Sequence, residues 1–473
     1  MLDERKLARQ MAVPTLDSQV RVRLREVGAP MTLFGEREAD RRARLVDVMV
    51  ARGEHMPQAQ HGMAAPMDEE EEEEEFYTEG PVALLQARRR IAAFSLAHAK
   101  ARIAQQRREA DVPLTEVAAL RKRVFDHVKT YTVLGSQVGG ERPISVVRFS
   151  PDAKLLATGG WSGSAALWSV PNATQQAALH GHEDRVTGLA WHPRATLTQS
   201  ASAVNLATGG GDGVIRTWGL DTEQPLQKLV GHEARVARIA FHPTGAYLAS
   251  ASFDGTWRLW DVERAQELQL QEGHSREVYA VDFQCDGALI ASGGLDAIGR
   301  VWDARTGRTA MVLDGHAREV LSMAFAPNGY QIASSSGDDT VKIWDLRKLS
   351  SVYTIPAHRS SVADVRFFSA GEERRAEPVG LRDHAVGADG HADDMDAHAD
   401  AADNPAPALP RSGLYMATAG YDGLVKVWSA DDWQLIKSLS GDSGKVMSVD
   451  ISSDGQYLAS GEWARTFKLW GAL

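Results

Sequence analysis

Three short stretches of the sequence contain residue types that could support catalysis or ligand binding. The first is "GDSGK" at residues 441–445, which resembles the stretch around a serine protease nucleophile and also ends like a phosphate-binding loop. It lacks the first glycine of such a loop, and Val446 stands where a Ser or Thr should follow the lysine. A serine nucleophile needs a nearby His and Asp, and the surrounding repeat has neither at its usual place. No enzymatic role is expected here.

The other two stretches are rich in glycine or in His and Asp. "GGGDG" at 209–213 is interpreted as a tight turn between strands, because no helical pattern follows it. "HADDMDAHADAAD" at 391–403 could bind a metal weakly, but its composition is more typical of a solvated, disordered loop. The sequence therefore predicts neither a resident metal nor a cofactor.

Five His–Asp pairs could be mistaken for acid–base dyads. Because they recur at a fixed repeat distance, a structural role is the favoured interpretation. The pairs are His182 with Asp212, His232 with Asp254, His274 with Asp296, His316 with Asp338, and His358 with Asp422.

Seven tryptophans mark the repeat to which these pairs belong. They are separated by 50, 42, 42, 42, 84 and 42 residues, and a period near 42 is typical of four-stranded propeller blades. The 84-residue gap holds a low-complexity insert, roughly 369–412, within one repeat. The tryptophans are Trp168, Trp218, Trp260, Trp302, Trp344, Trp428 and Trp470.

Each tryptophan has a Ser or Thr ten residues before it, and five have the His and the Asp as well. These four groups can satisfy one another: Asp accepts from His, His bonds the hydroxyl, and the hydroxyl accepts from the indole. The first repeat has Ser136 and Ser162 at the His and Asp positions, and the last has Asp442 and Ala464. The pattern resembles the WD40 family. It implies an all-β seven-bladed WD40 β-propeller with an α-helical N-terminal extension.

The ring of blades must be closed by strand pairing between its two ends. The last repeat stops after its third strand, at "KLWGAL". We expect "HVKTYTVLGS" at 127–136 to supply the missing fourth strand, which leaves no open sheet edge.

The residue before the Asp position of each repeat is a candidate binding surface. Aromatic residues are preferred anchors at interfaces, and this position is often aromatic or apolar. The alternative, that each side chain packs on a neighbouring blade, is equally supported by the sequence. The residues are Trp161, Phe253, Leu295, Tyr421 and Trp463, with glycine at 211 and 337.

A small helical unit precedes the repeats. Asp17 is a plausible N-cap for a first helix, with Val20, Leu24 and Val27 on one face and Gly28 as its end. A second helix is predicted from about 36 to 52, with Ala39, Ala43, Val46 and Val50 facing inward. The two are joined by "PMTLF", and the unit is too small to hold much core alone. We expect Met31, Leu33 and Phe34 to bind a partner.

A charged segment follows. "MDEEEEEEEF" at 67–76 is expected to be disordered, and residues 81–110 read as one long helix opened by Pro81. Residues 76–130 hold eleven Lys or Arg and five acids, a net charge of +6. An apolar set, Leu84, Ile91 and Phe94, suits docking on a protein while phosphates are neutralised. The predicted RNA-contact residues are Arg88, Arg89, Arg90, Lys100, Arg102, Arg107 and Arg108.

The N-terminal stretch resembles the splicing factor motif of the pre-mRNA processing factor 4 family. The matching residues are "VPT" at 13–15, "VRVRLREVGAPMTLFGE" at 20–36 and "DRRARL" at 40–45. The resemblance implies a non-catalytic scaffold of the U4/U6 and U4/U6.U5 tri-snRNP particles, in the nucleus and its speckles. It also implies as partners a pre-mRNA processing factor 3 homologue, a cyclophilin-type prolyl isomerase and U4/U6 snRNA.

Bulk properties agree with that reading. The net charge of −11 argues against wholesale wrapping by nucleic acid, and the single cysteine, Cys285, fits a reducing compartment. No uncharged apolar run approaches the roughly 20 residues of a membrane span. The expected domains are a helical motif at 1–60, an acidic run and basic helix at 61–127, and the propeller at 128–473.

One alternative of a different class remains open. "WDAR" at 302–305 and "WDLR" at 344–347 resemble adaptor-docking turns, which would suit a WD40 substrate receptor of a cullin ubiquitin ligase.

Overall fold

The computed structural model describes residues 17–30, 37–52, 81–370, 411–441 and 444–472. They belong to two compact units, Met1–Thr78 and Glu79–Leu473. The basic segment, which the sequence suggested as a region of its own, lies in the same unit as the repeats.

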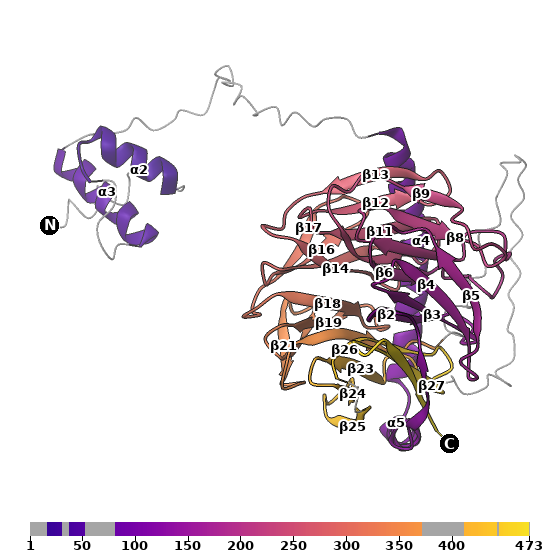
Figure 1. The fold of residues 1–473 in the computed structure, drawn as a ribbon. Helices are drawn as coiled ribbons and strands as arrows, with labels where there is room; N and C mark the ends of the chain where they lie inside the picture. Colours follow the sequence, from indigo (N-terminus) through magenta and orange to yellow (C-terminus); the bar gives the residue numbers. More distant parts are fainter. Residues whose placement is uncertain (1–16, 31–36, 53–80, 371–410, 442–443, 473) are drawn as a thin grey trace, which may run out of the picture. The chain divides into compact units, whose positions relative to one another are not determined.

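The second unit contains a ring of seven four-stranded antiparallel sheets, which confirms the propeller (Figure 1). The first strand of each sheet contacts the first strands of both neighbours, so these strands surround the centre. Blades 1 to 3 are β2 (Ile144–Phe149), β3 (Leu155–Gly160), β4 (Ser164–Ser169), β5 (Gln175–His180); β6 (Val186–Trp191), β7 (Leu206–Gly210), β8 (Ile215–Trp218), β9 (Gln227–Leu229); and β10 (Val236–Phe241), β11 (Tyr247–Ser252), β12 (Trp257–Asp261), β13 (Gln266–Gln271).

Blades 4 to 7 follow the same order, and the last takes its outer strand from the start of the ring. They are β14 (Val278–Phe283), β15 (Leu289–Gly294), β16 (Gly299–Asp303), β17 (Thr309–Leu313); β18 (Val320–Phe325), β19 (Gln331–Ser336), β20 (Val341–Asp345), β21 (Ser350–Ile355); β22 (Val362–Phe367), β23 (Tyr415–Gly420), β24 (Leu424–Ser429), β25 (Leu435–Ser440); and β26 (Val446–Ile451), β27 (Tyr457–Glu462), β28 (Thr466–Gly471), β1 (Thr132–Val138).

Strand β1 pairs antiparallel with β28, from Thr132 opposite Gly471 to Val138 opposite Thr466. The expected closure therefore forms, but its start was placed too early. Residues 127–129 belong to the helix α5 (Leu114–Lys129). These residues are helical and not extended because the helix buries Val128, and just beyond it Tyr131, in the core of blades 6 and 7.

Small residues on the second strand of a blade let the next blade approach closely. A Cβ atom added to Gly159 would lie 2.8 Å from Val186 Cγ1, and one added to Gly209 would lie 2.7 Å from Val236 Cγ1. Both distances are shorter than carbon atoms tolerate. Glycine at these positions is thus required by blade packing.

The network of Trp, Ser or Thr, His and Asp, which we call the tetrad, forms in the five repeats that contain all four residues. In blade 4, Trp302 Nε1 donates to Ser292 Oγ at 2.8 Å, Ser292 Oγ lies 2.8 Å from His274 Nε2, and His274 Nδ1 lies 3.1 Å from Asp296. Burial lowers the pKa of His274, so the ring is neutral and donates its Nδ1–H to the carboxylate. The corresponding bonds are present around His182, His232, His316 and His358.

The first and last repeats retain only the inner part of this network. Trp168 donates to Thr158 and Trp470 donates to Ser460, both at 2.9 Å. In blade 1 the Asp position is Ser162, whose hydroxyl bonds Ser164 at 2.7 Å. The indole bond is therefore common to all seven blades, whereas the His–Asp part is found in five.

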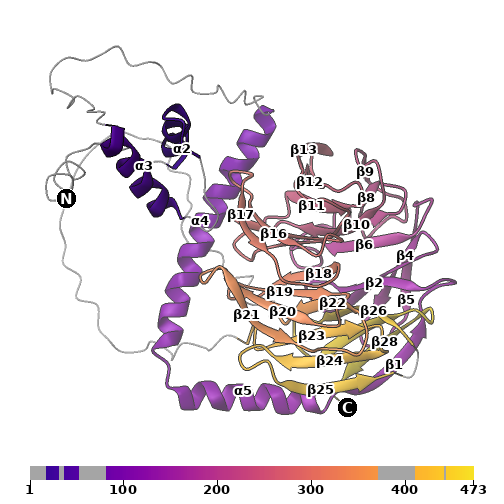
Figure 2. The same ribbon diagram turned by 90° about the vertical axis from the view of Figure 1, so that its left-hand side faces the viewer.

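Two helices connect directly to the ring. α4 (Val82–Ala110) runs across one face of the propeller and α5 continues beside β25, as Figure 2 shows. Leu84 and Ile91 of α4 are buried in one cluster with Tyr247 and Trp257 of blade 3. The apolar set predicted to dock on a protein thus docks on the chain's own propeller.

The N-terminal unit is a pair of helices, α2 (Asp17–Glu26) and α3 (Glu38–Arg52). The inner face predicted for α2 is correct, since Val20, Leu24 and Val27 are buried, and the chain turns at Gly28 with φ +72°. Residues 31–36, with Met31, Leu33 and Phe34, lie outside the described residues.

The inner face predicted for α3 is wrong at Ala43 and Val46, and the side chains of Ala39 and Val50 lie outside the described residues. Leu45 and Met49 are buried, whereas Ala43 is exposed and Val46 is half-buried. The alanines and valines also repeat at helical spacing, but Leu and Met are larger, and their burial removes more apolar surface from water.

The insert leaves a blade hairpin intact. β22 and β23 pair normally, with Phe367 opposite Met416. Gly413 N donates to Phe368 O at 2.8 Å, and Ala370 N donates to Ser412 Oγ at 2.7 Å. The two ends of the insert are therefore held together, and residues 371–410 lie outside the described residues.

We expect the change Asp296→Ala to lower the free energy of unfolding by about 1–3 kcal/mol, since it removes the acceptor of a buried His274. Asp296 also accepts from the backbone of Ser275 and Ile298, both at 3.2 Å. Thermal melting of the full chain measures the effect. Ser162→Ala, at the same position of blade 1, is the control and should melt like the parent. Equal melting of both variants would contradict a structural role for the His–Asp pair.

We also expect that replacing residues 371–410 with a short Gly-Ser turn leaves the melting temperature unchanged. The bonds between 368–370 and 411–413 already close the hairpin, and shortening a surface connection changes loop entropy only slightly. Calorimetry of the shortened chain tests this. Aggregation or loss of a cooperative transition would show that the segment contributes to the fold.

Candidate functional site

One backbone hydrogen bond repeats in all seven blades and builds the rim on one face of the ring. The residue before the Asp position donates its N–H to the carbonyl of the residue just before the inner strand of the same blade. The donor–acceptor pairs are Trp161–Pro143, Gly211–Arg185, Phe253–Arg235, Leu295–Glu277, Gly337–Glu319, Tyr421–Ser361 and Trp463–Lys445, at 2.7–3.0 Å. Each candidate turn residue is thereby placed next to one loop residue, and together they form a double circle.

Loop residues of like charge lie in neighbouring parts of this circle. Lys445, Arg185 and Arg235 come from blades 7, 2 and 3, separated only by the neutral blade 1, and we call them the basic arc. Glu277 and Glu319 come from the adjacent blades 4 and 5, and we call them the acidic arc. At these seven loop positions the cations therefore lie on one side of the ring and the anions on another, although Asp184 pairs with Arg185 and Arg276 with Glu277.

The cations of the basic arc lie over the aromatic turn residues. The Arg235 guanidinium is 3.6 Å from the centre of the Phe253 ring, and Arg185 is 4.9 Å from the ring of Trp161. Lys445 lies 5.2 Å from Tyr421 and 5.8 Å from Trp463. Such contacts hold both partners in place and keep the charge available at the surface.

Inside the rim lies a pocket of about 260 Å³. Its wall contains Trp161, Phe253, Tyr421 and Trp463, together with Arg185 and Arg235 of the basic arc and Tyr279. Burial raises the pKa of Tyr421 to about 12, so its phenol is neutral. The pocket combines aromatic faces with guanidinium groups, which suits a ligand with an anionic group and some apolar surface.

Four of the five predicted turn residues line this pocket, and two of them also pack on a neighbouring blade. Trp161 and Trp463 pack edge to face across neighbouring blades with ring centres 4.8 Å apart, yet Trp463 is 44% exposed. Leu295 is half-buried and does not line the pocket.

Six charged residues at the centre of the ring were not identified from the sequence. Arg148 lies 3.1 Å from Asp364, and Arg238 lies 3.6 Å from the same carboxylate. Ser322 and Ser448 each donate to Asp364 at 2.8 Å. Arg366, Asp282 and Asp450 complete the cluster, which has equal numbers of positive and negative groups.

The cluster lies on the inner strands, where Asp364 is fully buried and Asp282, Arg366 and Asp450 are half-buried. Burial would raise the pKa of Asp364, but Arg148, Arg238 and Arg366 hold it well below its ordinary value. Burial raises the pKa of Asp450, although Phe149 N donates to it at 2.7 Å. A sequence signal is present, because these residues occupy the third and fifth positions of inner strands whose other residues are mostly apolar.

The basic residues of α4 divide between two faces of the helix. Arg102 donates to Asp286 at 2.6 Å and to Asn328 O at 2.9 Å, and Arg88 donates to Gln269 at 3.1 Å. Burial alone would lower the pKa of Arg102, but the Asp286 carboxylate raises it overall. These two residues attach the helix to the propeller. The exposed ones are Arg89, Arg90, Lys100, Arg107 and Arg108.

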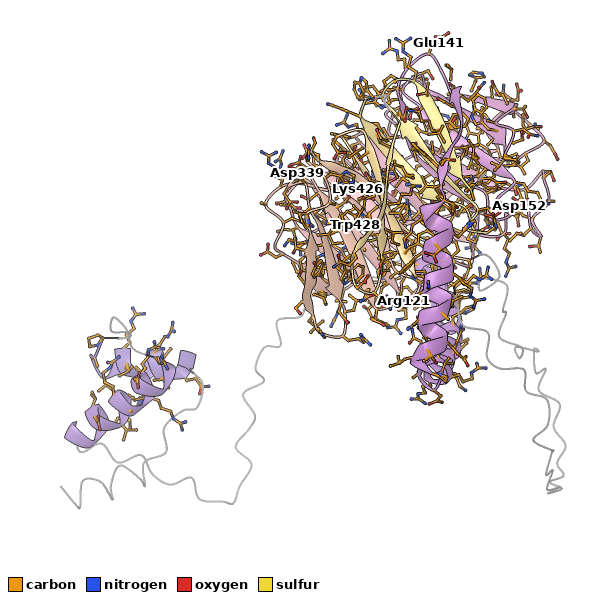
Figure 3. All side chains as sticks on the ribbon, turned by 90° about the horizontal axis from the view of Figure 1, so that it is seen from below. Arg121, Glu141, Asp152, Asp339, Lys426 and Trp428 are labelled. Atoms are coloured by element: carbon orange, nitrogen blue, oxygen red, sulfur yellow. The ribbon has the colours of Figure 1, made fainter. Side chains whose placement is uncertain are left out.

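One aromatic contact, between Phe94 of α4 and His242 of blade 3, extends this attachment. The rings of Phe94 and His98 stack at 3.8 Å, and Phe94 meets His242 of blade 3 edge on at 5.7 Å. Burial lowers the pKa of His242 to about 4, so this ring is neutral. At α5, Arg121 points toward the propeller and lies 2.9 Å from Asp431 (Figure 3). Both helices are therefore anchored by polar as well as apolar contacts.

The remaining sequence candidates contribute no further site among the described residues. Arg305 and Arg347 of the two WD turns each pair with the preceding Asp at 2.8 Å. Residues 442–443 of "GDSGK" and the His-rich stretch 391–403 lie outside the described residues. The described part of the chain contains no group of three potential metal ligands, and none of its helices is long and apolar enough to cross a membrane.

Comparison with known families defines the class first. The model for the WD domain, G-beta repeat, matches residues 131–169, 173–219, 223–261, 265–303, 307–345 and 433–471, about half of the chain. The chain therefore belongs to the WD-repeat family.

The helical pair gives a narrower assignment. Residues 20–48 match the model "pre-mRNA processing factor 4 (PRP4) like". The U4/U6 small nuclear ribonucleoprotein Prp4 of Homo sapiens is 40% identical over 198 residues, 41% of this chain and 38% of the relative. An uncharacterised WD repeat-containing protein of Schizosaccharomyces pombe is 42% identical over 193 residues, 40% of this chain and 41% of the relative. The matched region spans about two fifths of each relative. The chain is thus similar to the PRP4-like proteins in its helical motif as well as in its repeats.

The attachment of α4 gives a direct test. We expect Ile91→Asp to destabilise the propeller by about 2–4 kcal/mol, because it places a charge in a fully buried apolar site. Leu96→Asp on the same helix is the control, since Leu96 is 62% exposed. Melting of both variants is compared with the parent. An unchanged melting temperature for Ile91→Asp would mean that α4 does not pack on the ring in solution.

Proposed function

We propose that the protein is a non-catalytic scaffold subunit of the U4/U6 particle and of the U4/U6.U5 tri-snRNP in pre-mRNA splicing. The observation that carries the proposal is the PRP4-like helical pair in front of a WD-repeat propeller. The Prp4 relatives of Homo sapiens and Pongo abelii bear the name of the U4/U6 small nuclear ribonucleoprotein. A protein with this role acts in the nucleus, in spliceosomes and speckles.

Three surfaces of the protein would each bind a different kind of partner. The motif docks a partner through Met31, Leu33 and Phe34, for which a pre-mRNA processing factor 3 homologue and a cyclophilin-type prolyl isomerase are the proposed candidates. The exposed basic face of α4 neutralises phosphates of U4/U6 snRNA. The pocket inside the rim holds a segment of a further protein.

The basic face of α4 supports phosphate binding for a geometric reason. Arg88 and Arg102 are engaged with the propeller, which fixes the rotation of the helix about its axis. Arg89, Lys100 and Arg107 are consequently exposed on a rigid element, so less side-chain and backbone freedom is lost when a phosphate is bound.

Affinity purification of the full chain from its own cells, with sequencing of the bound RNA, tests the proposal. We expect U4 and U6 snRNA in the purified material. The double change Leu33→Asp with Phe34→Asp should reduce incorporation far more than tenfold, since burying one such side chain contributes about 2–3 kcal/mol. A cullin adaptor in place of the RNA would contradict the proposal.

The control for that variant is the stability of the propeller. Because α4 packs on the ring, the correct reference is the fragment 79–473 and not one that begins at 128. We expect the fragment and the full chain to share one melting transition. A much less stable fragment would mean that the motif packs on its own propeller and is not free to dock a partner.

A further inference from the structure

We propose that the pocket inside the rim binds a peptide segment of a partner protein through an anionic side chain that pairs with the basic arc and Arg238. The inference rests on the proposed role of this pocket as a partner-binding surface. It adds the chemistry of the ligand, which neither the fold nor the relatives specify.

Arg238 is the residue at the base of the pocket. It lines the pocket, and its side chain is nine-tenths buried. Its Nη1 atom is buried and makes no hydrogen bond to any described residue, although Asp364 lies 3.6 Å away. A buried guanidinium nitrogen without an acceptor destabilises the folded state. An anionic group that enters the pocket could accept a hydrogen bond from this atom.

The basic arc supplies the second contact with the ligand. Arg185 and Arg235 lie on the pocket wall and belong to neighbouring blades 2 and 3. Their stacking on Trp161 and Phe253 holds the guanidinium planes in place. Arg185 also lies 3.7 Å from the carboxylate of Asp184, so part of its charge is already offset. A carboxylate or phosphate that binds between them can accept hydrogen bonds from two guanidinium groups that are already in position. Such charge-assisted hydrogen bonds are strong.

The acidic arc favours a peptide over a nucleic acid. Glu277, which lies 3.5 Å from Arg276, and Glu319 are on the same rim and disfavour an RNA strand with a phosphate at every nucleotide. A peptide can place one anionic side chain at the basic arc and neutral or cationic residues at the acidic arc. The aromatic side chains Tyr421 and Trp463 then cover its apolar parts.

The pocket faces away from the basic face of α4. Strand β11 begins at Tyr247, which packs with α4, and ends one residue before Phe253 on the pocket wall. Six strand residues span about 20 Å, so the two surfaces lie at opposite ends of the blades. A peptide could therefore occupy the pocket while RNA contacts the helix.

Selection of random 12-residue peptides displayed on phage, with the full chain as bait, tests the inference. We expect enrichment of peptides with Asp or Glu, whose synthetic forms lose about tenfold or more in affinity when that residue is replaced by Asn or Gln. The variant Arg185→Gln with Arg235→Gln should weaken binding similarly. The variant Arg276→Gln with Arg318→Gln, next to the acidic arc, is the matched control and should bind as the parent does.

A phosphoserine form of the selected peptide distinguishes two sources of the anion. Tighter binding of this form than of the Asp form assigns the pocket to phosphorylated partners, and equal or weaker binding assigns it to plain acidic ones. The inference is overturned if no acidic sequence is enriched, if the Arg185/Arg235 variant binds normally, or if a 12-nucleotide RNA displaces the peptide through the same arginines. Peptide binding without co-purifying U4 and U6 snRNA would sink the proposed function and leave this inference standing.

Discussion

The pairing of β1 with β28 is the interaction on which the rest of the structure depends. Each blade packs its inner strand and its buried tryptophan against its neighbours, and this packing is complete only when the circle is closed. The closing strand comes from the N-terminal side of the repeats and follows α5 after only two residues. Closure therefore fixes the helices as well as the blades.

Because of this connection, one rigid body presents two surfaces of different chemistry. α4 is attached at the face where the first and second strands of blades 3 to 5 turn, through Ile91, Arg102 and their partners. The polar rim and its pocket form the opposite face. The charged cluster around Asp364 lies on the inner strands of the ring, between these two faces.

Much of this architecture could be predicted from the sequence because it repeats. The seven tryptophans and the His–Asp pairs recur at a period that only a propeller explains, and the ring closure followed from the missing last strand. The inner face of α3 could not be predicted, since two helical faces had similar patterns and only side-chain size separated them. The packing of α4 was missed for a related reason: an apolar helix face does not reveal whether its partner is another protein or the same chain. The pocket could be predicted only as a set of turn residues, because its charge pattern depends on which loop residue each turn touches.

The account is tested most directly by mapping ultraviolet crosslinks between the chain and its bound RNA in purified particles. If α4 binds RNA and the rim binds a peptide, as proposed, crosslinked peptides should come from the exposed face of α4, around Arg89, Lys100 and Arg107. Peptides containing the pocket residues Phe253 and Trp463 should stay free of RNA. Crosslinks concentrated at the rim, with none on α4, would contradict the account.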